Sequence, residues 1–426
     1  MAIGRRQRVG WVGGWLVGLA AAVGSCAGGS ADSSPVAGGT VSGTVAGCEV
    51  GRAPLTLGEG VFPYIEPEDL LRIGSDFLVV GTPSYTWAPG TEGDSLPLTT
   101  EAHIAARFTL GGRAVLIEKP IADHIGGVRA LPLGGDRWGL LFDQVVPGSS
   151  TQVTRSVGLW YAEHDGARWS VLEAVPFPDQ GRLDFFSSSE MVRVEGDLVW
   201  VVPVRQTAGQ TELLQYERRS DGWHSEATSG DIVEVATLAY EAGSGLWLAH
   251  FSEDPELPEW QQSLRLYRRG AGWELVRRVA VMPVGAKVVD PSIAIFPDGV
   301  TVSWRVESGA DDGAYAMVGI GADGGGTTLR LDPRVLQVMS LRPPDGRPAW
   351  IVQHHDDSGS VELRLLRRRP PFEADVVAST SSPYSAFLAS LALAPSEALI
   401  VGPQVSSDPA DPYVRSLILR LSPSCT

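Results

Sequence analysis

The sequence predicts an all-β domain made of repeated units, and three observations support this prediction. After residue 26 the chain consists of short β-rich runs, separated roughly every eight to twelve residues by clusters of Gly, Pro, Asp and Ser. No segment of this part shows the apolar periodicity of an amphipathic helix. The third observation is an internal repeat, in which an apolar strand, a tight turn and a strongly apolar second strand follow one another.

The repeat occurs seven times along the chain. Its turns are Gly74-Ser75-Asp76, Gly135-Asp136, Gly196-Asp197, Gly243-Ser244-Gly245, Asp298-Gly299, Asp345-Gly346 and Pro395-Ser396. In five units a tryptophan falls at a similar place in the second strand: Trp138, Trp200, Trp247, Trp304 and Trp350. Each unit continues through a variable loop into a hairpin. Four strands in about fifty residues are typical of a propeller blade. The chain therefore resembles a single β-propeller, with seven four-stranded blades expected and six or eight as the alternatives.

The two ends of the domain are expected to close the ring together. The last unit has three clear strands, and the segment 49–57 can supply the fourth. Pairing of the N- and C-terminal strands would bring Cys48 close to Cys425, and an exported protein meets an oxidising compartment. We therefore expect a disulfide between them, contributing roughly 4–5 kcal/mol in the loop-entropy picture. The propeller domain is expected to span residues 48–426.

The N-terminus has the pattern of an export signal. Arg5, Arg6 and Arg8 precede an apolar run from Val9 to Val23, which is too short for a comfortable membrane span. The run ends in Val23-Gly24-Ser25-Cys26, which resembles the bacterial lipobox. The resemblance implies cleavage after residue 25 and acylation of Cys26, the alternative being an ordinary secretory signal.

The resemblance also implies where the protein resides. A lipid-anchored protein of the cell envelope is expected, and Ala27 after the cysteine suggests the outer membrane if the host is Gram-negative. Residues 26–47, which carry the acylated Cys26, are rich in Gly, Ser and Ala and predict a flexible tether.

Charge and motifs exclude several functions. The formal net charge of −16 becomes −19 once the three arginines of the signal are removed, and such an acidic protein is a poor nucleic-acid binder.

Gly319 to Gly324 matches G-x-G-x-x-G, but a strand-like segment follows instead of the helix that a dinucleotide site needs, so a hairpin turn is predicted. Adjacent His354 and His355 would point to opposite sides of an extended chain, which disfavours a shared metal ion. No cofactor and no metal are expected.

The loops between second and third strands, together with the connections between blades, are expected to gather at one end of the ring. They are long and rich in acidic and aromatic residues, and irregular loops on a rigid scaffold commonly carry function. The connections add Asp123, Asp184 and Asp290. Nine loop side chains are candidates for ligand binding, the acids for a cationic or basic ligand and the aromatics for stacking on sugars or peptides: Tyr85, Trp87, Asp94, Asp254, Trp260, Asp312, Asp357, Asp411 and Tyr413.

The predicted function is that of a binding or scaffold module, with a glycan, a peptide or an envelope protein as its ligand. No catalytic motif is found, so an enzyme is not favoured. The hairpins at Asp165-Gly166 and at Ser220-Asp221-Gly222-Trp223 faintly resemble the Asp-box hairpins of sialidase-like propellers. A glycan-acting hydrolase or lyase is therefore one alternative, and a structural subunit of an envelope assembly is the other.

Overall fold

The computed structural model describes thirty strands between Gly43 and Leu421, together with the short links between many of them. The described residues are 43–421 except 46–47, 55–64, 84–101, 110–113, 147–154, 178–181, 184–190, 206–210, 230–232, 242, 254–256, 258–260, 283, 285, 287, 297–298, 307–314, 322–325, 332–333, 342–348, 356–360, 367–375, 382–388, 395–396 and 406–413. Within these ranges no helix is long and apolar enough to cross a membrane.

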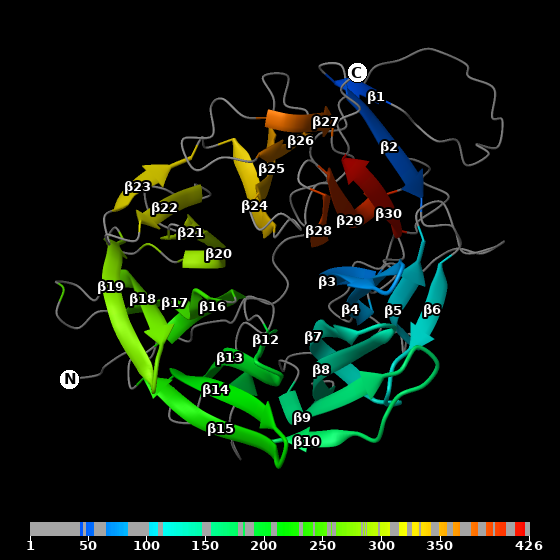
Figure 1. The fold of residues 1–426 in the computed structure, drawn as a ribbon, viewed down its shortest axis with the longest axis horizontal. Helices are drawn as coiled ribbons and strands as arrows, with labels where there is room; N and C mark the ends of the chain where they lie inside the picture. The colour runs from blue at the N-terminus through cyan, green and yellow to red at the C-terminus, as the bar shows by residue number, and fades with distance from the viewer. Residues whose placement is uncertain are drawn as a thin grey trace, which may run out of the picture.

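Antiparallel sheets of consecutive strands are arranged around a common centre, which makes the fold a β-propeller (Figure 1). Blade 1 contains β3 (Ile65–Ile73), β4 (Asp76–Pro83), β5 (His103–Phe108) and β6 (Val115–Glu118). Blade 2 contains β7 (His124–Gly134), β8 (Arg137–Val146), β9 (Arg155–His164) and β10 (Glu173–Val175). Blade 3 contains β12 (Met191–Val194), β13 (Asp197–Arg205), β14 (Thr211–Arg219) and β15 (Gly222–Ser229), and the short β11 (Arg182–Leu183) also pairs with β13.

Three further blades follow the same order. Blade 4 contains β16 (Val233–Glu241), β17 (Gly245–Glu253), β18 (Gln262–Arg269) and β19 (Trp273–Val281). Blade 5 contains β20 (Val288–Phe296), β21 (Gly299–Val306), β22 (Tyr315–Gly321) and β23 (Gly326–Arg330). Blade 6 contains β24 (Val335–Leu341), β25 (Ala349–His355), β26 (Val361–Leu366) and β27 (Val376–Ser381). β22 and β23 pair antiparallel, as the hairpin predicted around Gly319 to Gly324 requires.

The remaining sheet closes the ring and corrects the prediction of seven four-stranded blades. Six blades are built on four consecutive strands, whereas the closing sheet has five: β28 (Ala389–Ala394), β29 (Glu397–Val405), β30 (Val414–Leu421), β2 (Cys48–Pro54) and β1 (Gly43–Val45). As predicted, the N-terminal strand pairs with the C-terminal one, with Val50 opposite Leu421. β1 and β2 form an antiparallel hairpin, and β1 lies within the segment 26–47 that the sequence predicts as a tether.

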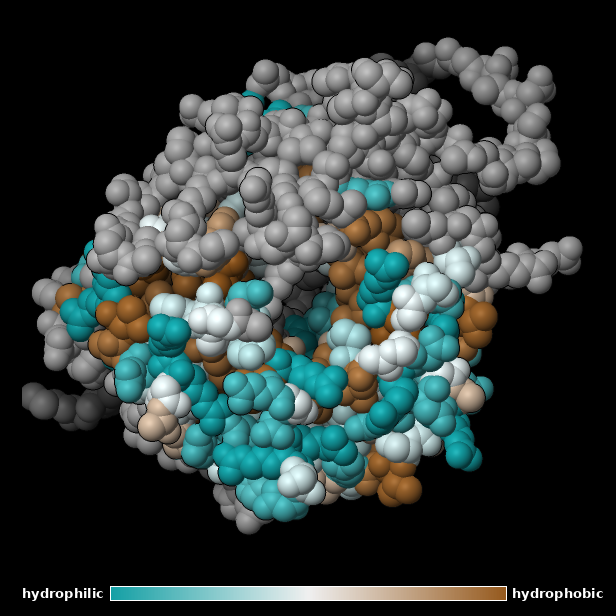
Figure 2. Space-filling view, in the orientation of Figure 1, coloured by the Kyte–Doolittle hydropathy of each residue, from teal (hydrophilic) through white to brown (hydrophobic). Residues whose placement is uncertain are grey.

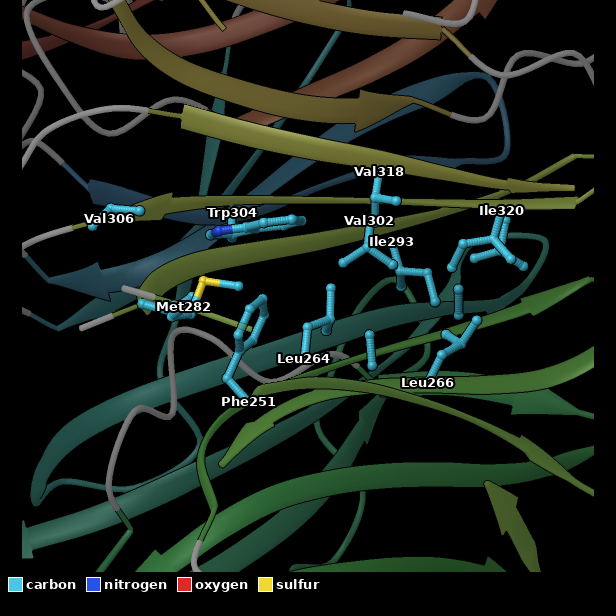
Figure 3. Close-up of a cluster of buried hydrophobic side chains, with 14 of the residues drawn as sticks. Phe251, Leu264, Leu266, Met282, Ile293, Val302, Trp304, Val306, Val318 and Ile320 are labelled. Atoms are coloured by element: carbon cyan, nitrogen blue, oxygen red, sulfur yellow. The ribbon is translucent and has the colours of Figure 1, made fainter. Parts of the chain in front are cut away.

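The hydrophobic core is distributed around the ring, because each sheet buries its apolar faces against its two neighbours. Among the described residues, seven apolar clusters lie at successive contacts between neighbouring sheets. Figure 3 shows the cluster between blades 4 and 5, where Phe251 and Leu264 face Trp304 and Val302. Four of the five second-strand tryptophans are fully buried in such contacts: Trp138, Trp200, Trp304 and Trp350. This distribution explains how a chain of this length forms one domain.

Candidate functional site

The propeller has two ends that differ in their chain connections. We call the end with the turns between first and second strands and between third and fourth strands the turn end. The loop end carries the loops between second and third strands and the connections between blades. All nine residues predicted to bind a ligand lie outside the described residues: Tyr85, Trp87, Asp94, Asp254, Trp260, Asp312, Asp357, Asp411 and Tyr413. The site is therefore built from the described residues of the inner strands and of the connection between blades 1 and 2.

Three charged side chains meet on the innermost strands of blades 1 and 2. A guanidinium nitrogen of Arg129 on β7 lies 3.0 Å from a carboxylate oxygen of Glu68 and 4.0 Å from one of Asp69, both on β3. Asp69 also accepts the backbone N–H of Ala130 at 2.7 Å. Burial raises the pKa of Asp69 above its ordinary value, although the Arg129 charge and the Ala130 hydrogen bond oppose the rise. Burial between blades 1 and 2 thus disfavours the ionisation of this carboxylate.

β-bulges recur in the loop-end half of the inner strands. The register shifts between Pro67 and Asp69 in β3, which leaves Glu68 as the extra residue. Corresponding shifts occur in four other inner strands, at Ile125/Val128 in β7, Val233/Val235 in β16, Val289/Ser292 in β20 and Val335/Gln337 in β24. A bulge bends its strand and redirects side chains, and bulges are frequent next to functional sites. The inner wall of the ring is therefore irregular near the loop end, where the predicted binding loops begin.

A hydrogen-bonded group occupies the connection between blades 1 and 2 at the loop end. The amide of Gln144 donates to Asp123 at 2.7 Å and accepts the indole N–H of Trp160 at 2.9 Å. The ammonium of Lys119 donates to the backbone carbonyl of Asp123 at 2.8 Å. Asp123 was one of the connection acids that the sequence pointed to, and in the structure the Gln144 amide links its carboxylate to the Trp160 indole. An acid, an amide and a half-buried indole together form a surface that can bind a polar ligand.

The turn end is held by further ion pairs between blades. Arg107 of blade 1 binds Asp76 of the same blade at 2.7 Å and Asp136 of blade 2 at 3.1 Å. The hydrogen bond from Arg107 lowers the pKa of Asp76, with burial opposing it. Between blades 3 and 4, Glu217 is paired with both Arg219 and Arg269. Burial alone would raise the pKa of Glu217, but the two guanidiniums outweigh it and lower the pKa.

Arg218 makes the most elaborate of these contacts, between blades 2 and 3. Its guanidinium donates to both carboxylate oxygens of Glu173, at 2.8 and 2.6 Å, and to Glu163 at 3.1 Å. It also lies 4.7 Å from the centre of the Tyr161 ring. Tyrosine, glutamate and arginine are residue types used in glycan-cleaving sites, but Tyr161 is fully buried and its pKa is raised by burial and by the nearby Glu163 charge. This group joins two blades, and its tyrosine is closed to a substrate.

Tryptophans in three neighbouring hairpins connect each blade to the preceding one. The indole of Trp169 donates to the Glu118 carbonyl at 2.8 Å, and that of Trp273 donates to the Gln215 side chain at 2.6 Å. Trp223 meets the edge of the Tyr161 ring with centroids 5.4 Å apart. Trp169 and Trp223 belong to the Asp-box-like hairpins of the sequence, so in this chain these hairpins contribute a contact between blades.

Sequence reasoning missed most of the described site. Glu68, Asp69, Arg129, Gln144 and Trp160 were not predicted, although a charged residue inside an apolar run such as that around Arg129 is a signal of a paired, functional or structural charge. The described residues contain no group of three metal-ligating side chains. Figure 2 shows one face of the ring, hollowed near its centre, with hydrophilic residues gathered over blades 2 and 3. The described arrangement is suited to binding a polar ligand.

Comparisons with known proteins bear on the fold alone. No protein family and no curated protein matches the chain. Among solved structures, it is similar to a protein of unknown function from Dyadobacter fermentans, with 12% identity, a TM-score of 0.49 and coverage of 89% of this chain and 100% of that one. The polysaccharide lyase Uly1 shows 11% identity and a TM-score of 0.49, with coverage of 89% of this chain and 94% of that one. The WD40 domain of SCAP from fission yeast shows 10% identity and a TM-score of 0.41, with coverage of 88% of this chain and 94% of that one. Identities this low carry no information about function, and the propeller assignment stands on the sheet topology.

Proposed function

We propose that this protein is an exported, lipid-anchored β-propeller that binds a positively charged ligand, such as a basic peptide segment, at its loop end. The net charge of −16 would attract a cation over the whole surface. The aspartates predicted in the loops would concentrate that attraction at one end. The aromatic residues among them, Tyr85, Trp87, Trp260 and Tyr413, would stack on the ligand.

The observation that carries the proposal is the difference between the two ends of the ring. Glu173 and Glu217 at the turn end are engaged with arginines of the next blade. They are structural charges, and a cationic ligand would have to displace those arginines. At the loop end, Asp123 has an amide and an ammonium as its neighbours, and the sequence predicts five further aspartates in the loops of this end. Binding at the loop end therefore leaves the contacts between blades intact.

The enzyme alternative receives no support from the described residues. The group with suitable residue types, around Tyr161, lies on the third and fourth strands with its tyrosine buried.

The alternative of an assembly through the outer strands also has little support. The exposed apolar residues Val115, Leu275 and Val276 lie on the outer strands of two different blades, and scattered apolar residues are normal on protein surfaces.

The ligand class can be tested by calorimetry with three probes: an arginine hexapeptide, a Gly/Ser hexapeptide of the same length and a neutral hexasaccharide. We expect the arginine peptide to bind, with an affinity that falls as salt rises, because screening weakens exposed charge pairs. The Gly/Ser peptide should not bind. Binding of the hexasaccharide alone would replace the cation proposal with glycan recognition, and its cleavage would favour the enzyme. If none of the three probes binds, the protein is not a receptor of this kind.

The anchor and the closing disulfide form part of the same proposal. Cys48 is the first residue of β2, and Val50 of the same strand pairs with Leu421 of β30, the last described residue before Cys425 in the sequence. Cys26 and Cys425 lie outside the described residues, and no disulfide is present among those described. Non-reducing peptide mass spectrometry of protein from its native membrane should find an acylated Cys26 and a Cys48–Cys425 linked peptide. An unmodified residue 26 with two free thiols would overturn both parts.

A further inference from the structure

A histidine packed against two tryptophans lies where the β9–β10 hairpin of blade 2 meets blade 1. His164, the last residue of β9, is almost fully buried. The centroid of its imidazole lies 5.5 Å from the Trp138 ring and 4.9 Å from the Trp169 ring, and the two tryptophans also contact each other. Trp169 donates its indole N–H to the backbone carbonyl of Glu118 in blade 1. His164 therefore supports a side chain that connects the two blades.

A hydrogen bond inside the turn requires the imidazole to be neutral. The Nδ1 atom of His164 lies 3.1 Å from the backbone nitrogen of Gly166 and accepts its N–H. A ring nitrogen accepts a hydrogen bond only while it carries no proton, so the single ring proton of this arrangement is on Nε2. A second proton would bind at Nδ1. It would remove the acceptor of the Gly166 N–H and leave two N–H groups facing each other.

The charged side chains around this turn come from four elements: Asp165 in the turn itself, Arg107 on β5, Asp76 on β4 and Asp136 in the turn between β7 and β8. Arg107 is paired with both Asp76 and Asp136. A Cβ atom at Gly166 would lie 3.8 Å from a guanidinium nitrogen of Arg107, so the turn is seated directly on this group. Burial lowers the pKa of His164. The Asp165 charge opposes this decrease, and the Arg107 charge adds to it.

We propose that His164 is a pH-sensitive switch: its neutral imidazole holds the β9–β10 hairpin on blade 1, and protonation releases the hairpin. The proton taken up at Nδ1 breaks the hydrogen bond from Gly166 and places a charge among buried aromatic rings, so Trp169 separates from Glu118. A pKa lowered by folding means that the folded state binds this proton less tightly than the unfolded state. The contact is therefore strongest above the ordinary pKa of histidine and is lost as the pH falls through the folded value. The switch does not depend on cation binding at the loop end.

Hydrogen exchange of the whole chain tests the switch between about pH 7 and about pH 4.5, with labelling times scaled to the intrinsic pH dependence of exchange. The reporting amides are Gly166, which donates to His164, and Ser170, which donates to the Glu163 carbonyl. We expect their protection to fall in acid, by up to about tenfold for each pH unit below the folded pKa, because release is linked to one proton.

Two variants separate His164 from other groups that bind protons. His164→Asn offers an oxygen to the Gly166 N–H but takes up no proton in this range, so its hairpin should not respond to acid. His224→Asn is the matched control, because His224 is an exposed histidine in the corresponding hairpin of blade 3, paired with Asp221. It should respond as the wild type does. The same acid response in the wild type and in His164→Asn would overturn the proposal.

A third variant decides the question if the hairpin of His164→Asn is already open at neutral pH. Asp165→Asn keeps the oxygen that accepts two backbone N–H groups of the turn. It removes the negative charge that favours protonation of His164. The midpoint of the acid response should therefore move to lower pH. A midpoint that does not move, or moves to higher pH, would overturn the proposal.

Discussion

At the scale of single residues, the ion pairs of this acidic protein differ in burial and in whether they join two blades or lie within one hairpin. Arg129 is almost fully buried and holds Glu68 across the boundary between blades 1 and 2, and Arg218 holds Glu173 across the next boundary. In both cases the partner lies about one repeat away in sequence, so the pairs tie successive blades together. Exposed pairs within one hairpin, such as Arg168 with Asp165, have no such role.

Arg218 and Glu173 are expected to be energetically coupled, so that the effects of their substitutions on stability do not add. In a double-mutant cycle with Arg218→Met and Glu173→Gln, we predict a coupling of about 1 kcal/mol, because the pair is bidentate but Glu173 remains 38% exposed. The control cycle, Arg168→Met with Asp165→Asn, should show no measurable coupling. Urea unfolding measures both coupling free energies. Equal values in the two cycles would show that the ion pair between blades stabilises the protein no more than an exposed pair within one hairpin.

Asp69 provides a pH prediction with a definite sign. A carboxyl whose pKa is higher in the folded state binds its proton more tightly when folded. It therefore favours folding below its unfolded pKa, and this contribution is lost as pH rises through the folded value. Asp69→Asn cannot ionise but keeps an oxygen for the Ala130 N–H. The stability of Asp69→Asn relative to the wild type should therefore increase between pH 4 and pH 7, as measured by urea unfolding. A relative stability that falls over this range would mean that Arg129 lowers the pKa of Asp69.

At the scale of strands and hairpins, local sequence determined what could be predicted. Turns such as Asp136 after Gly135, and tryptophans such as Trp200 in second strands, marked the repeat because their roles depend on neighbours along the chain. The bulge at Glu68 and the pairing of Asp69 with the Ala130 N–H depend on which residue of another sheet lies opposite. The strand count of the closing sheet was missed because β1 is three residues long within a Gly-rich segment.

Close packing across one strand pair gives a prediction at this scale. A Cβ atom at Gly139 on β8 would overlap the Tyr161 hydroxyl on β9, whereas one at Gly319 on β22 would meet nothing closer than Thr301 Oγ1 at 3.8 Å. Gly139→Ala should destabilise the protein by about 1–3 kcal/mol, because Tyr161 must move out of its buried place. Gly319→Ala should be neutral or slightly stabilising. Denaturant unfolding compares the two, and similar values for both would contradict the packing described for blade 2.

At the scale of the whole molecule, the ring joins six blades, each built on four consecutive strands, to a five-stranded closing sheet, and its two ends are specialised. At the turn end, short hairpins carry the tryptophans and the ion pairs that lock neighbouring blades together. Bulged inner strands lead to the loop end, where Asp123, Gln144 and Trp160 form a polar group. In this account the turn end gives stability and the loop end gives recognition, so the two properties should respond to different substitutions.

The most direct test of this account compares two triple variants that remove the same number of negative charges. The loop-end set is Asp254→Asn, Asp312→Asn and Asp357→Asn, and the turn-end set is Asp136→Asn, Glu173→Gln and Glu217→Gln. Binding of the arginine hexapeptide and the melting temperature are measured for both. The loop-end set should weaken binding by about tenfold or more with little change in melting temperature. The turn-end set should lower the melting temperature by at least about 2 °C and leave binding unchanged. Equal loss of binding in both sets would show that net charge alone attracts the peptide, and would contradict the division of roles between the two ends.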